Sequence, residues 1–232
     1  LTNAGVVAPP AAFTGFADAS YSADGRYALL RDRNRRVQLW QTDPWQSRSA
    51  LFSVDHLGYE AYLPWLVGPG GRFACMLRVA ARELVVFDPL EAAPPRSGLF
   101  PGDGGISAWG HSHDGRTLAL GDFEGRVFLL DLNTLAVRTL PSARGREVTW
   151  VAFSEDDRWV AAGRYDGTAY AFDVASGDSL TAGLVQHDFV IQRVDINRAQ
   201  RTVFVAGEGT AALWRLPETH APVARHPLRV AP

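Results

Sequence analysis

One phrase recurs five times along this chain. In each copy a turn of small and polar residues ends in an arginine, and a bulky apolar residue closes an apolar run about 14 residues later. The turn arginines, which recur about every 44 residues, are Arg26, Arg72, Arg116, Arg158 and Arg201. The closing residues are Trp40, Phe87, Leu130, Phe172 and Trp214. Because a single unit of this length cannot bury its apolar faces alone, the copies are expected to stack on one another.

The fourth copy shows most clearly what each unit contains. Residues 148–154, 159–163 and 168–172 are apolar or alternating runs, a pattern typical of β-strands. Polar turns at 155–158 and 165–167 join them, and their Asp and Gly residues tolerate the conformations of tight hairpins. A further turn at 173–178 leads to a shorter outer strand near 179–184. The sequence therefore predicts an all-β protein, a β-propeller of four-stranded antiparallel blades with five blades in this chain.

Five such units use almost all of the 232 residues, so we expect a single β-propeller domain spanning 1–232. The expected blades are 16–55, 56–100, 101–143, 144–186 and 187–216. Segment 1–15 is a candidate closing strand, and 217–232 is a tail or an outer strand. Two alternatives stay open. Five blades could close into a ring, or they could belong to a larger propeller whose other blades lie outside this chain.

Composition narrows the classes of partner. A net charge of −2 argues against a general nucleic-acid or membrane-surface binder, and no apolar run reaches the roughly 18 residues of a membrane helix. The single cysteine, Cys75, excludes an internal disulfide. No signal-peptide pattern and no initiating Met open the sequence, which suits a mature product or an excised part of a longer protein. We expect a cytoplasmic protein whose partner is a protein or peptide, with no nucleic acid and no membrane.

Motifs for catalysis or cofactor binding are absent from the sequence. It has no G-x-S-x-G elbow, and because it has no lysine it cannot form a G-x-x-x-x-G-K-[ST] phosphate loop. The pair His111 and His113 gives the single hint of metal chemistry, because strand alternation would place both imidazoles on one face. No Cys accompanies the pair, and it precedes a turn opposite the expected binding face. We therefore expect no metal, no cofactor and no enzymatic activity.

Unit four resembles a repeat of the WD-repeat family, and the resemblance extends over about residues 16–216. The matching residues of unit four are Val151, Ala152, Phe153, Ser154, Arg158, Ala161, Ala162, Gly163, Asp166, Gly167, Thr168, Phe172, Asp173, Val174 and Gly177. The pairs Phe87-Asp88 and Leu130-Asp131 stand where that family has its Trp-Asp pair. The resemblance implies a propeller that serves as an interaction platform, usually without catalysis.

The chain also departs from that family's pattern. Arg144 stands in unit four where the family often has the histidine of a Gly-His pair. The acidic turn residue that such a histidine would bond is Asp166 in unit four, Glu124 in unit three and Glu208 in unit five. We therefore expect the family's hydrogen-bond tetrad to be incomplete in most units, so that strand packing carries more of the stability.

The resemblance also implies a binding face. In the family, the hairpins between second and third strands and the loops that enter first strands open on one face, called the top. Arginine and aromatic side chains there are candidate anchors, since arginine binds acidic groups bidentately and both are enriched at interface hot spots. The candidate partner-binding residues are Arg31, Arg33, Arg35, Arg36, Tyr59, Phe123, Arg144, Arg146, Arg164, Tyr165 and Phe189. In the competing interpretation, the arginines of 31–36 form a solvated hairpin tip offset by Asp32, and the aromatic residues cap the packing of the blades.

The leading functional hypothesis is an interaction or sensor scaffold of WD-repeat type that binds a partner on its top face. Such propellers often belong to larger bacterial signalling proteins, so further blades or domains of the same protein are also candidate partners. The alternative is a propeller hydrolase or glycan-binding protein with polar residues at the channel mouth. A third interpretation is a structural fragment with no ligand of its own.

Overall fold

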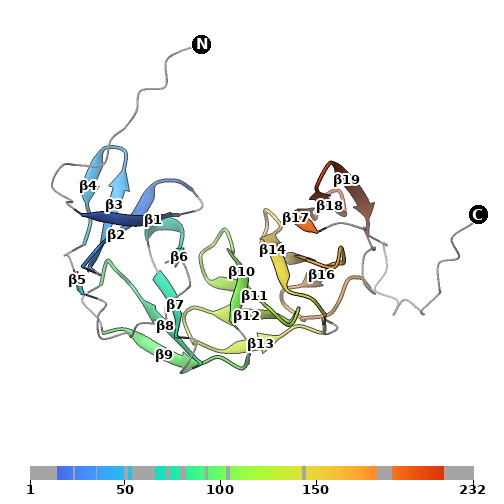
Figure 1. The fold of residues 1–232 in the computed structure, drawn as a ribbon, viewed down its shortest axis with the longest axis horizontal. Helices are drawn as coiled ribbons and strands as arrows, with labels where there is room; N and C mark the ends of the chain where they lie inside the picture. Colours follow the sequence, from blue (N-terminus) through green and yellow to red (C-terminus); the bar gives the residue numbers. More distant parts are fainter. Residues whose placement is uncertain are drawn as a thin grey trace, which may run out of the picture. The chain divides into compact units, whose positions relative to one another are not determined.

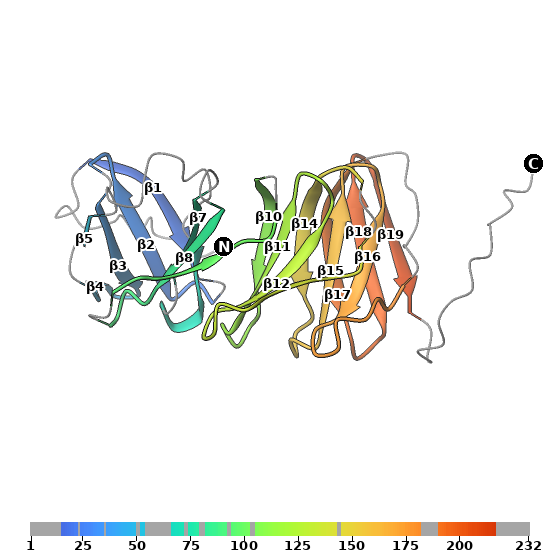
Figure 2. The same ribbon diagram turned by 90° about the horizontal axis from the view of Figure 1, so that it is seen from below.

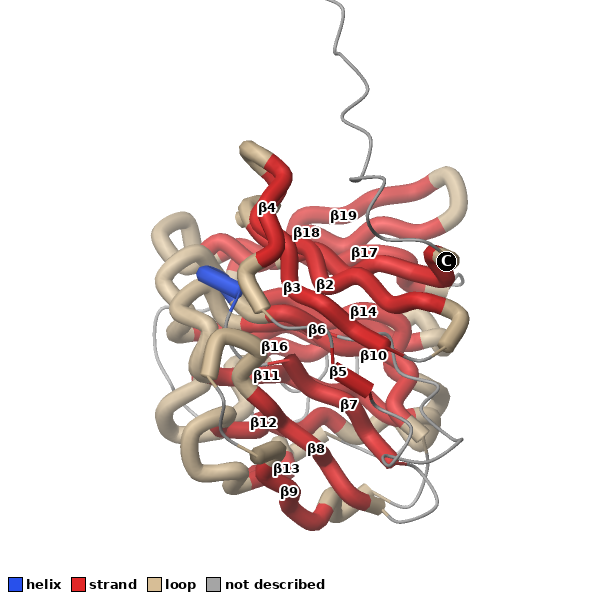
Figure 3. Tube along the Cα trace, turned by 90° about the vertical axis from the view of Figure 1, so that its left-hand side faces the viewer, coloured by secondary structure: helices blue, strands red, loops and turns tan. Residues whose placement is uncertain are grey.

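The computed structural model of the chain is built of β-strands joined by turns (Figure 1; Figure 3). It forms two compact units, residues 1–100 and 101–232, and each is described by itself. Among the described residues the helical structure is limited to a short 3-10 turn, η2 (Pro69–Gly71), and no helix there could cross a membrane. The structure describes residues 15–22, 24–34, 36–49, 52–53, 66–71, 74–78, 82–91, 94–102, 105–142, 145–181 and 190–216. The expected all-β fold class is confirmed.

The first unit contains two antiparallel sheets. Sheet A consists of β1 (Phe16–Tyr21), β2 (Tyr27–Asp32), β3 (Arg36–Thr42), β4 (Trp45–Ser47) and β5 (Phe52–Ser53), with β4 and β5 both pairing with β3. Sheet B consists of β6 (Leu66–Val67), β7 (Ala74–Arg78), β8 (Glu83–Phe87) and β9 (Arg96–Leu99). Buried apolar side chains of both sheets form one cluster, made of Leu29, Val37, Leu39, Val67, Val85 and Phe87.

The second unit contains three antiparallel sheets. Sheet C consists of β10 (Ile106–His111), β11 (Thr117–Asp122), β12 (Val127–Asp131) and β13 (Val137–Thr139). Sheet D consists of β14 (Val148–Phe153), β15 (Trp159–Arg164) and β16 (Ala169–Asp173), and sheet E of β17 (Ile191–Asn197), β18 (Thr202–Gly207) and β19 (Thr210–Arg215). Within this unit the first strands β10, β14 and β17 pack side by side in that order (Figure 2).

The strands of unit four lie where the sequence predicts them. The runs 148–154, 159–163 and 168–172 correspond to β14, β15 and β16, and the closing residue Phe172 lies in the third strand. The expected outer strand near 179–184 is reduced, in the described part, to an isolated bridge between Phe172 and Ser179. The one-unit-one-sheet pattern thus holds for all five copies of the repeat, with three or more strands in each sheet.

Neighbouring sheets of the second unit meet through a joint that occurs twice. At the β-bulge of β10 the hydroxyl of Ser107 donates to the carbonyl of Val148 in the next first strand, at 2.7 Å. At the corresponding bulge of β14 the hydroxyl of Thr149 donates to the carbonyl of Ile191. A glycine makes room at each joint, since a Cβ on Gly121 would lie 2.4 Å from Val148 Cβ. Because a bulge leaves one residue outside the ladder, its side chain is available to bond the neighbouring sheet.

The turn that ends in the repeated arginine also has a repeated hydrogen-bond pattern. In sheet C the hydroxyl of Ser112 donates to Asp114 Oδ1 at 2.7 Å and accepts from the N–H of Thr117 at 2.9 Å. Asp114 Oδ1 also accepts the N–H of Arg116 at 2.9 Å. Gly115 has a φ of 69°, which a residue without Cβ adopts at little steric cost. Equivalent bonds join Ser22 to Asp24 in sheet A and Ser154 to Asp156 in sheet D.

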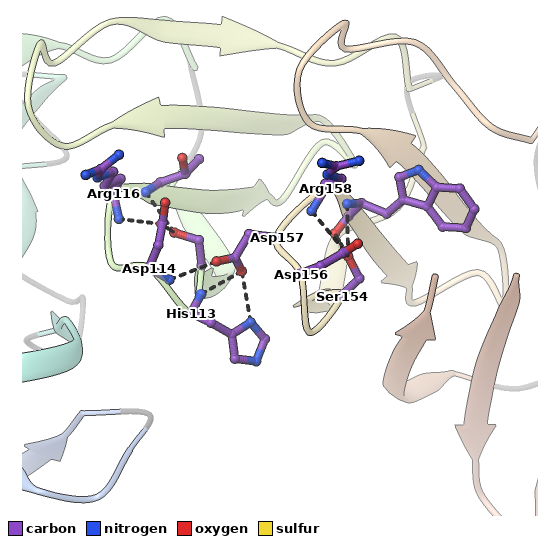
Figure 4. Close-up of polar contacts among 10 residues, drawn as sticks. His113, Asp114, Arg116, Ser154, Asp156, Asp157 and Arg158 are labelled. Carbon is purple, nitrogen blue, oxygen red and sulfur yellow. Dashed lines mark hydrogen bonds and ion pairs between the residues drawn. The ribbon is translucent and has the colours of Figure 1, made fainter. Parts of the chain in front are cut away.

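The turn of sheet D differs from those of sheets A and C because a residue other than glycine, Asp157, has the positive φ, and the side chain of Asp157 contacts the neighbouring sheet. Asp157 has a φ of 58° where the turn of sheet C has glycine. Its carboxylate accepts the N–H groups of His113 and Asp114, at 2.6 and 2.8 Å, and lies 2.9 Å from His113 Nδ1 (Figure 4). Asp tolerates the left-handed conformation better than most residues. The strained backbone of this turn therefore places a carboxylate against the turn of the neighbouring sheet, and we call these contacts the Asp157 clasp.

Candidate functional site

Three of the candidate contact residues meet at one pocket in the second unit. The pocket has a volume of about 370 Å³, is open to solvent and is lined by Phe123, Arg146, Glu147 and Tyr165. Phe123 belongs to the hairpin between β11 and β12, and Tyr165 to the hairpin between β15 and β16. Arg146 and Glu147 belong to the loop that enters β14. Both kinds of loop that were expected to form the binding face therefore contribute to this pocket.

Backbone hydrogen bonds hold the entering loop between the two hairpins. The N–H of Gly145 donates to the carbonyl of Glu124 at 3.0 Å, and the N–H of Tyr165 donates to the carbonyl of Glu147 at 2.9 Å. These bonds attach the loop to the β11–β12 hairpin on one side and to the β15–β16 hairpin on the other. The position of the entering loop is thus fixed by main-chain contacts, which do not depend on which side chains line the pocket.

Asp166 adds a third attachment to the entering loop. Burial raises the pKa of this carboxyl, but hydrogen bonds from the side chain and N–H of Thr168, the nearby charge of Arg164 and a bond from the N–H of Arg146 lower it below its usual value. Asp166 is therefore ionised at neutral pH, and its oxygens are engaged by groups of its own turn and of the entering loop.

The side chains at the mouth of the pocket combine exposed aromatic rings with a cation. Phe123 is 55% exposed and Tyr165 is 43% exposed, so both rings present apolar surface to solvent beside the pocket. The guanidinium carbon of Arg146 lies 5.2 Å from the centroid of the Tyr165 ring, a cation–π arrangement. Tyr165 therefore contacts the guanidinium of Arg146, a residue that stays exposed to solvent.

Arg164 lies inside the fold at this site and not on its surface. It is 2% exposed, and its Nη2 donates to the carbonyl of Gly125 at 2.7 Å. Its Nη1 donates to the hydroxyl of Tyr170 at 3.2 Å, and the guanidinium stacks on that ring at 4.4 Å from the centroid. The sequence-based expectation of a surface contact at Arg164 therefore needs correction, because the buried guanidinium ties sheet D to the hairpin of sheet C.

Sheets A and C have a different arrangement at the position of Arg164. Asp32 and Asp122 end the second strands there, and they are 2% and 0% exposed. Asp32 accepts from Arg36 Nε at 2.7 Å, and Asp122 accepts from Arg126 Nε at 2.6 Å. Sequence reasoning assigned the turn carboxylate of unit three to Glu124, which does stand in register with Asp166, but did not identify the buried pair of Asp122 and Arg126. The shared D-x-x-x-R spacing of residues 32–36 and 122–126 was the available signal.

The remaining candidate residues are distributed as follows. In the first unit Arg36 is bound to Asp32, Arg33 is exposed on the hairpin tip, and Arg31 is half-buried in β2. The basic hairpin is thus partly neutralised by its own buried carboxylate. Four other candidates lie outside the described residues, namely Arg35, Tyr59, Arg144 and Phe189.

The two histidines considered for metal binding do not come together as a ligand pair. Both ring nitrogens of His111 are shielded from solvent, and no described residue bonds them. His113 lies in the turn after the strand, where its Nδ1 contacts Asp157. Across the described ranges no group of three or more His, Cys, Asp or Glu side chains could hold a metal ion. Strand alternation does not apply to His113, because β10 ends at His111.

Comparison with known families places one segment of the chain. Residues 136–173 match the family model described as WD domain, G-beta repeat. The match begins at β13, the last strand of sheet C, and continues through β14, β15 and β16 of sheet D. This match and the antiparallel sheets together fit a WD-repeat family protein. No curated protein matches the sequence.

Proposed function

We propose that this chain is an interaction scaffold of WD-repeat type, and that it binds a partner protein or peptide at the pocket of Phe123, Arg146 and Tyr165. One observation carries the proposal. These three residues are far apart in the sequence and were singled out by residue type and loop position, and they line a single open pocket. Exposed aromatic and arginine side chains in a concave site are the usual anchors of protein interfaces.

The chemistry of the lining favours binding over catalysis. The four described side chains of the lining provide one guanidinium, one carboxylate and two aromatic rings, a set that suits recognition. A hydrolase would need a nucleophile and base, or a pair of carboxylates, within reach of one substrate. WD-repeat domains are generally non-catalytic scaffolds, and the family match extends into the loop that carries Arg146 and Glu147.

The scaffold itself is proposed to be a β-propeller in which each sheet is one blade. Two features support this. Every copy of the repeat forms its own antiparallel sheet, and the matched segment 136–173 takes its first strand from one sheet and the next three from the following sheet. A sequence repeat that takes strands from two successive sheets joins these two proposed blades through one continuous segment of chain. Partners in this proposal include further blades or domains of the same larger protein.

Affinity capture with the full chain tests the proposed site. The tagged chain and a Tyr165→Ala, Arg146→Ala double variant would be compared as baits, with Arg116→Ala as the matched control. Arg116 is an exposed arginine of the same unit, in the β10–β11 turn. A partner recovered by the wild type and the control but lost from the double variant is the expected result. Equal recovery by all three baits, each with an unchanged circular dichroism spectrum, would remove the pocket from the hypothesis.

The basic hairpin of the first unit is tested separately. An Arg33→Glu, Arg35→Glu variant changes two candidate contacts while leaving the Asp32–Arg36 pair intact. Reduced recovery of the same partner would assign the hairpin a part in binding, and undiminished recovery would mark it as a solvated tip.

A further inference from the structure

We infer that the pocket selects a peptide segment in which an aspartate or glutamate stands next to an aromatic or aliphatic residue. This inference rests on the proposed function and names the chemistry of the partner. It assigns separate roles to the side chains of the lining. Arg146 binds the carboxylate, and Phe123 and Tyr165 receive the apolar neighbour.

Arg146 is prepared to bind a carboxylate. Its guanidinium is exposed and forms no ion pair with any described residue, so its charge is available to a ligand. The guanidinium lies over the ring of Tyr165, with its carbon 5.2 Å from the centroid, and its N–H groups form no hydrogen bond with any described residue. Those N–H groups form the planar fork that matches a carboxylate bidentately. Binding should cost Arg146 less conformational entropy, because its side chain already lies over the Tyr165 ring in the unbound protein.

The two aromatic rings are suited to the apolar neighbour. Phe123 lies against the backbone at Gly105, where an added Cβ would come within 3.1 Å of its Cε2, and its N–H donates to the Gly105 carbonyl at 3.3 Å. Phe123 is thus supported by the backbone at Gly105, while more than half of its surface is exposed to solvent. The volume of about 370 Å³ is near the small end of ligand sites, so it suits a pair of side chains better than a folded domain surface.

The carboxylates near the pocket disfavour a phosphate more strongly than a ligand with a single carboxylate. Glu147 is half-buried in the lining, and Asp166 is ionised beside the entering loop. A phosphate, with a charge of about −1.5 to −2 at neutral pH, would be repelled more strongly by these groups than a single carboxylate. Glu147 can instead accept an N–H of the bound peptide backbone. The arrangement therefore favours one negative charge at Arg146 with a backbone donor opposite it.

A series of matched peptides tests this inference directly. The probe is the synthetic hexapeptide Ser-Gly-Asp-Phe-Gly-Ser, blocked at both ends and titrated into the full chain by isothermal calorimetry. Versions with Asn, Lys or phosphoserine in place of Asp, and with Gly in place of Phe, complete the series. Binding of the Asp-Phe peptide is expected to be about tenfold tighter than that of the Asn-Phe peptide, because a charge-assisted contact is lost.

Protein variants separate the roles of the side chains. Arg146→Ala is expected to abolish the preference for Asp over Asn, and Arg146→Lys to weaken it, because the charge remains but the fork is lost. Tyr165→Phe keeps the supporting ring and should bind as the wild type does, whereas Tyr165→Ala should not. Glu147→Gln should improve binding of the phosphoserine peptide more than that of the Asp peptide.

Three outcomes would overturn the inference. They are equal binding of the Asp and Asn peptides, tighter binding of the phosphoserine peptide by the wild type, and no binding of any peptide of the series at millimolar concentration. If capture of a protein partner still depends on Tyr165 and Arg146, any of these results rejects the acidic ligand while the proposed function stands. If capture does not depend on them, both proposals fail.

Discussion

Mild acid should weaken this fold through one side chain, His111. Both of its ring nitrogens are shielded from solvent and bonded to no described residue, and burial lowers its pKa to about 4. The same position of the next two first strands is occupied by Phe153 and Ile196, which are 8% and 7% exposed. His111 therefore occupies a site where the repeat otherwise places an apolar side chain, and it fits there only in the neutral form.

The size and direction of the effect follow from the two pKa values. In the unfolded chain His111 takes up a proton as the pH falls below about 6.5, whereas in the folded protein it stays neutral until about pH 4. The stabilisation linked to this histidine is thus complete above pH 6.5 and is lost as the pH falls from about 6.5 to about 4. The difference of about 2.5 between the two pKa values, at about 1.4 kcal/mol for each pH unit, corresponds to about 3.5 kcal/mol, of which about 2 kcal/mol is lost by pH 5.

Urea unfolding of the full chain at pH 7.5 and 5.0, followed by tryptophan fluorescence, measures this loss. His111→Phe restores the apolar residue of the repeat, and His111→Gln keeps a polar group that does not titrate. Both variants should lose about 2 kcal/mol less than the wild type between the two pH values. Protonation of carboxylates affects all three proteins alike and cancels in the difference. Parallel losses in the wild type and both variants would show that the reasoning about His111 is wrong.

Three further substitutions test contacts that hold the sheets and hairpins. Gly163→Ala adds a methyl group 2.4 Å from Ile191 Cγ2, so urea unfolding should show a loss of about 1–3 kcal/mol or more from overpacking at the joint between sheets D and E. Asp157→Gly removes the clasp but adopts the positive φ at little steric cost. Asp157→Ala removes the clasp and also keeps the strain of the positive φ. We expect thermal denaturation midpoints in the order wild type, Gly, Ala, with about 1 kcal/mol between the two variants. Asp122→Ala leaves the largely buried guanidinium of Arg126 with only the carboxylate of Glu124, 3.3 Å from its Nη2, and should cost about 3 kcal/mol by urea unfolding.

The strands were predictable from the sequence because their signal is local. Alternation and turn residues within one copy predict β14, β15 and β16, and the repeat extends that prediction to the other sheets. The position of Phe123 and Tyr165 on the hairpins after the second strands follows from the same register. That register alone placed both residues on loops that the structure brings to one pocket.

The contacts between copies were not predictable, because they depend on distances between residues that are not neighbours in the sequence. Asp157 looks like an ordinary polar turn residue, and its partner, the turn at His113, lies in another copy. Arg164 looks like an exposed hairpin arginine beside Tyr165. Its burial depends on Gly125, which has a φ of 79° and whose added Cβ would lie 3.1 Å from the Arg164 guanidinium. A buried arginine and an exposed one have the same local sequence signal.

The pocket and the buried arginine have a common origin in the way sheet D departs from sheet C. In sheet C, Asp122 closes its own hairpin by pairing with Arg126 four residues later. In sheet D the equivalent residue is Arg164, which reaches instead to the carbonyl of Gly125 in the hairpin of sheet C. The two hairpins are therefore tied to each other, and the next residue, Tyr165, is placed under Arg146 at the mouth of the pocket. A change that removes a contact within one copy thus creates a contact between copies, and the pocket forms where the repeats differ.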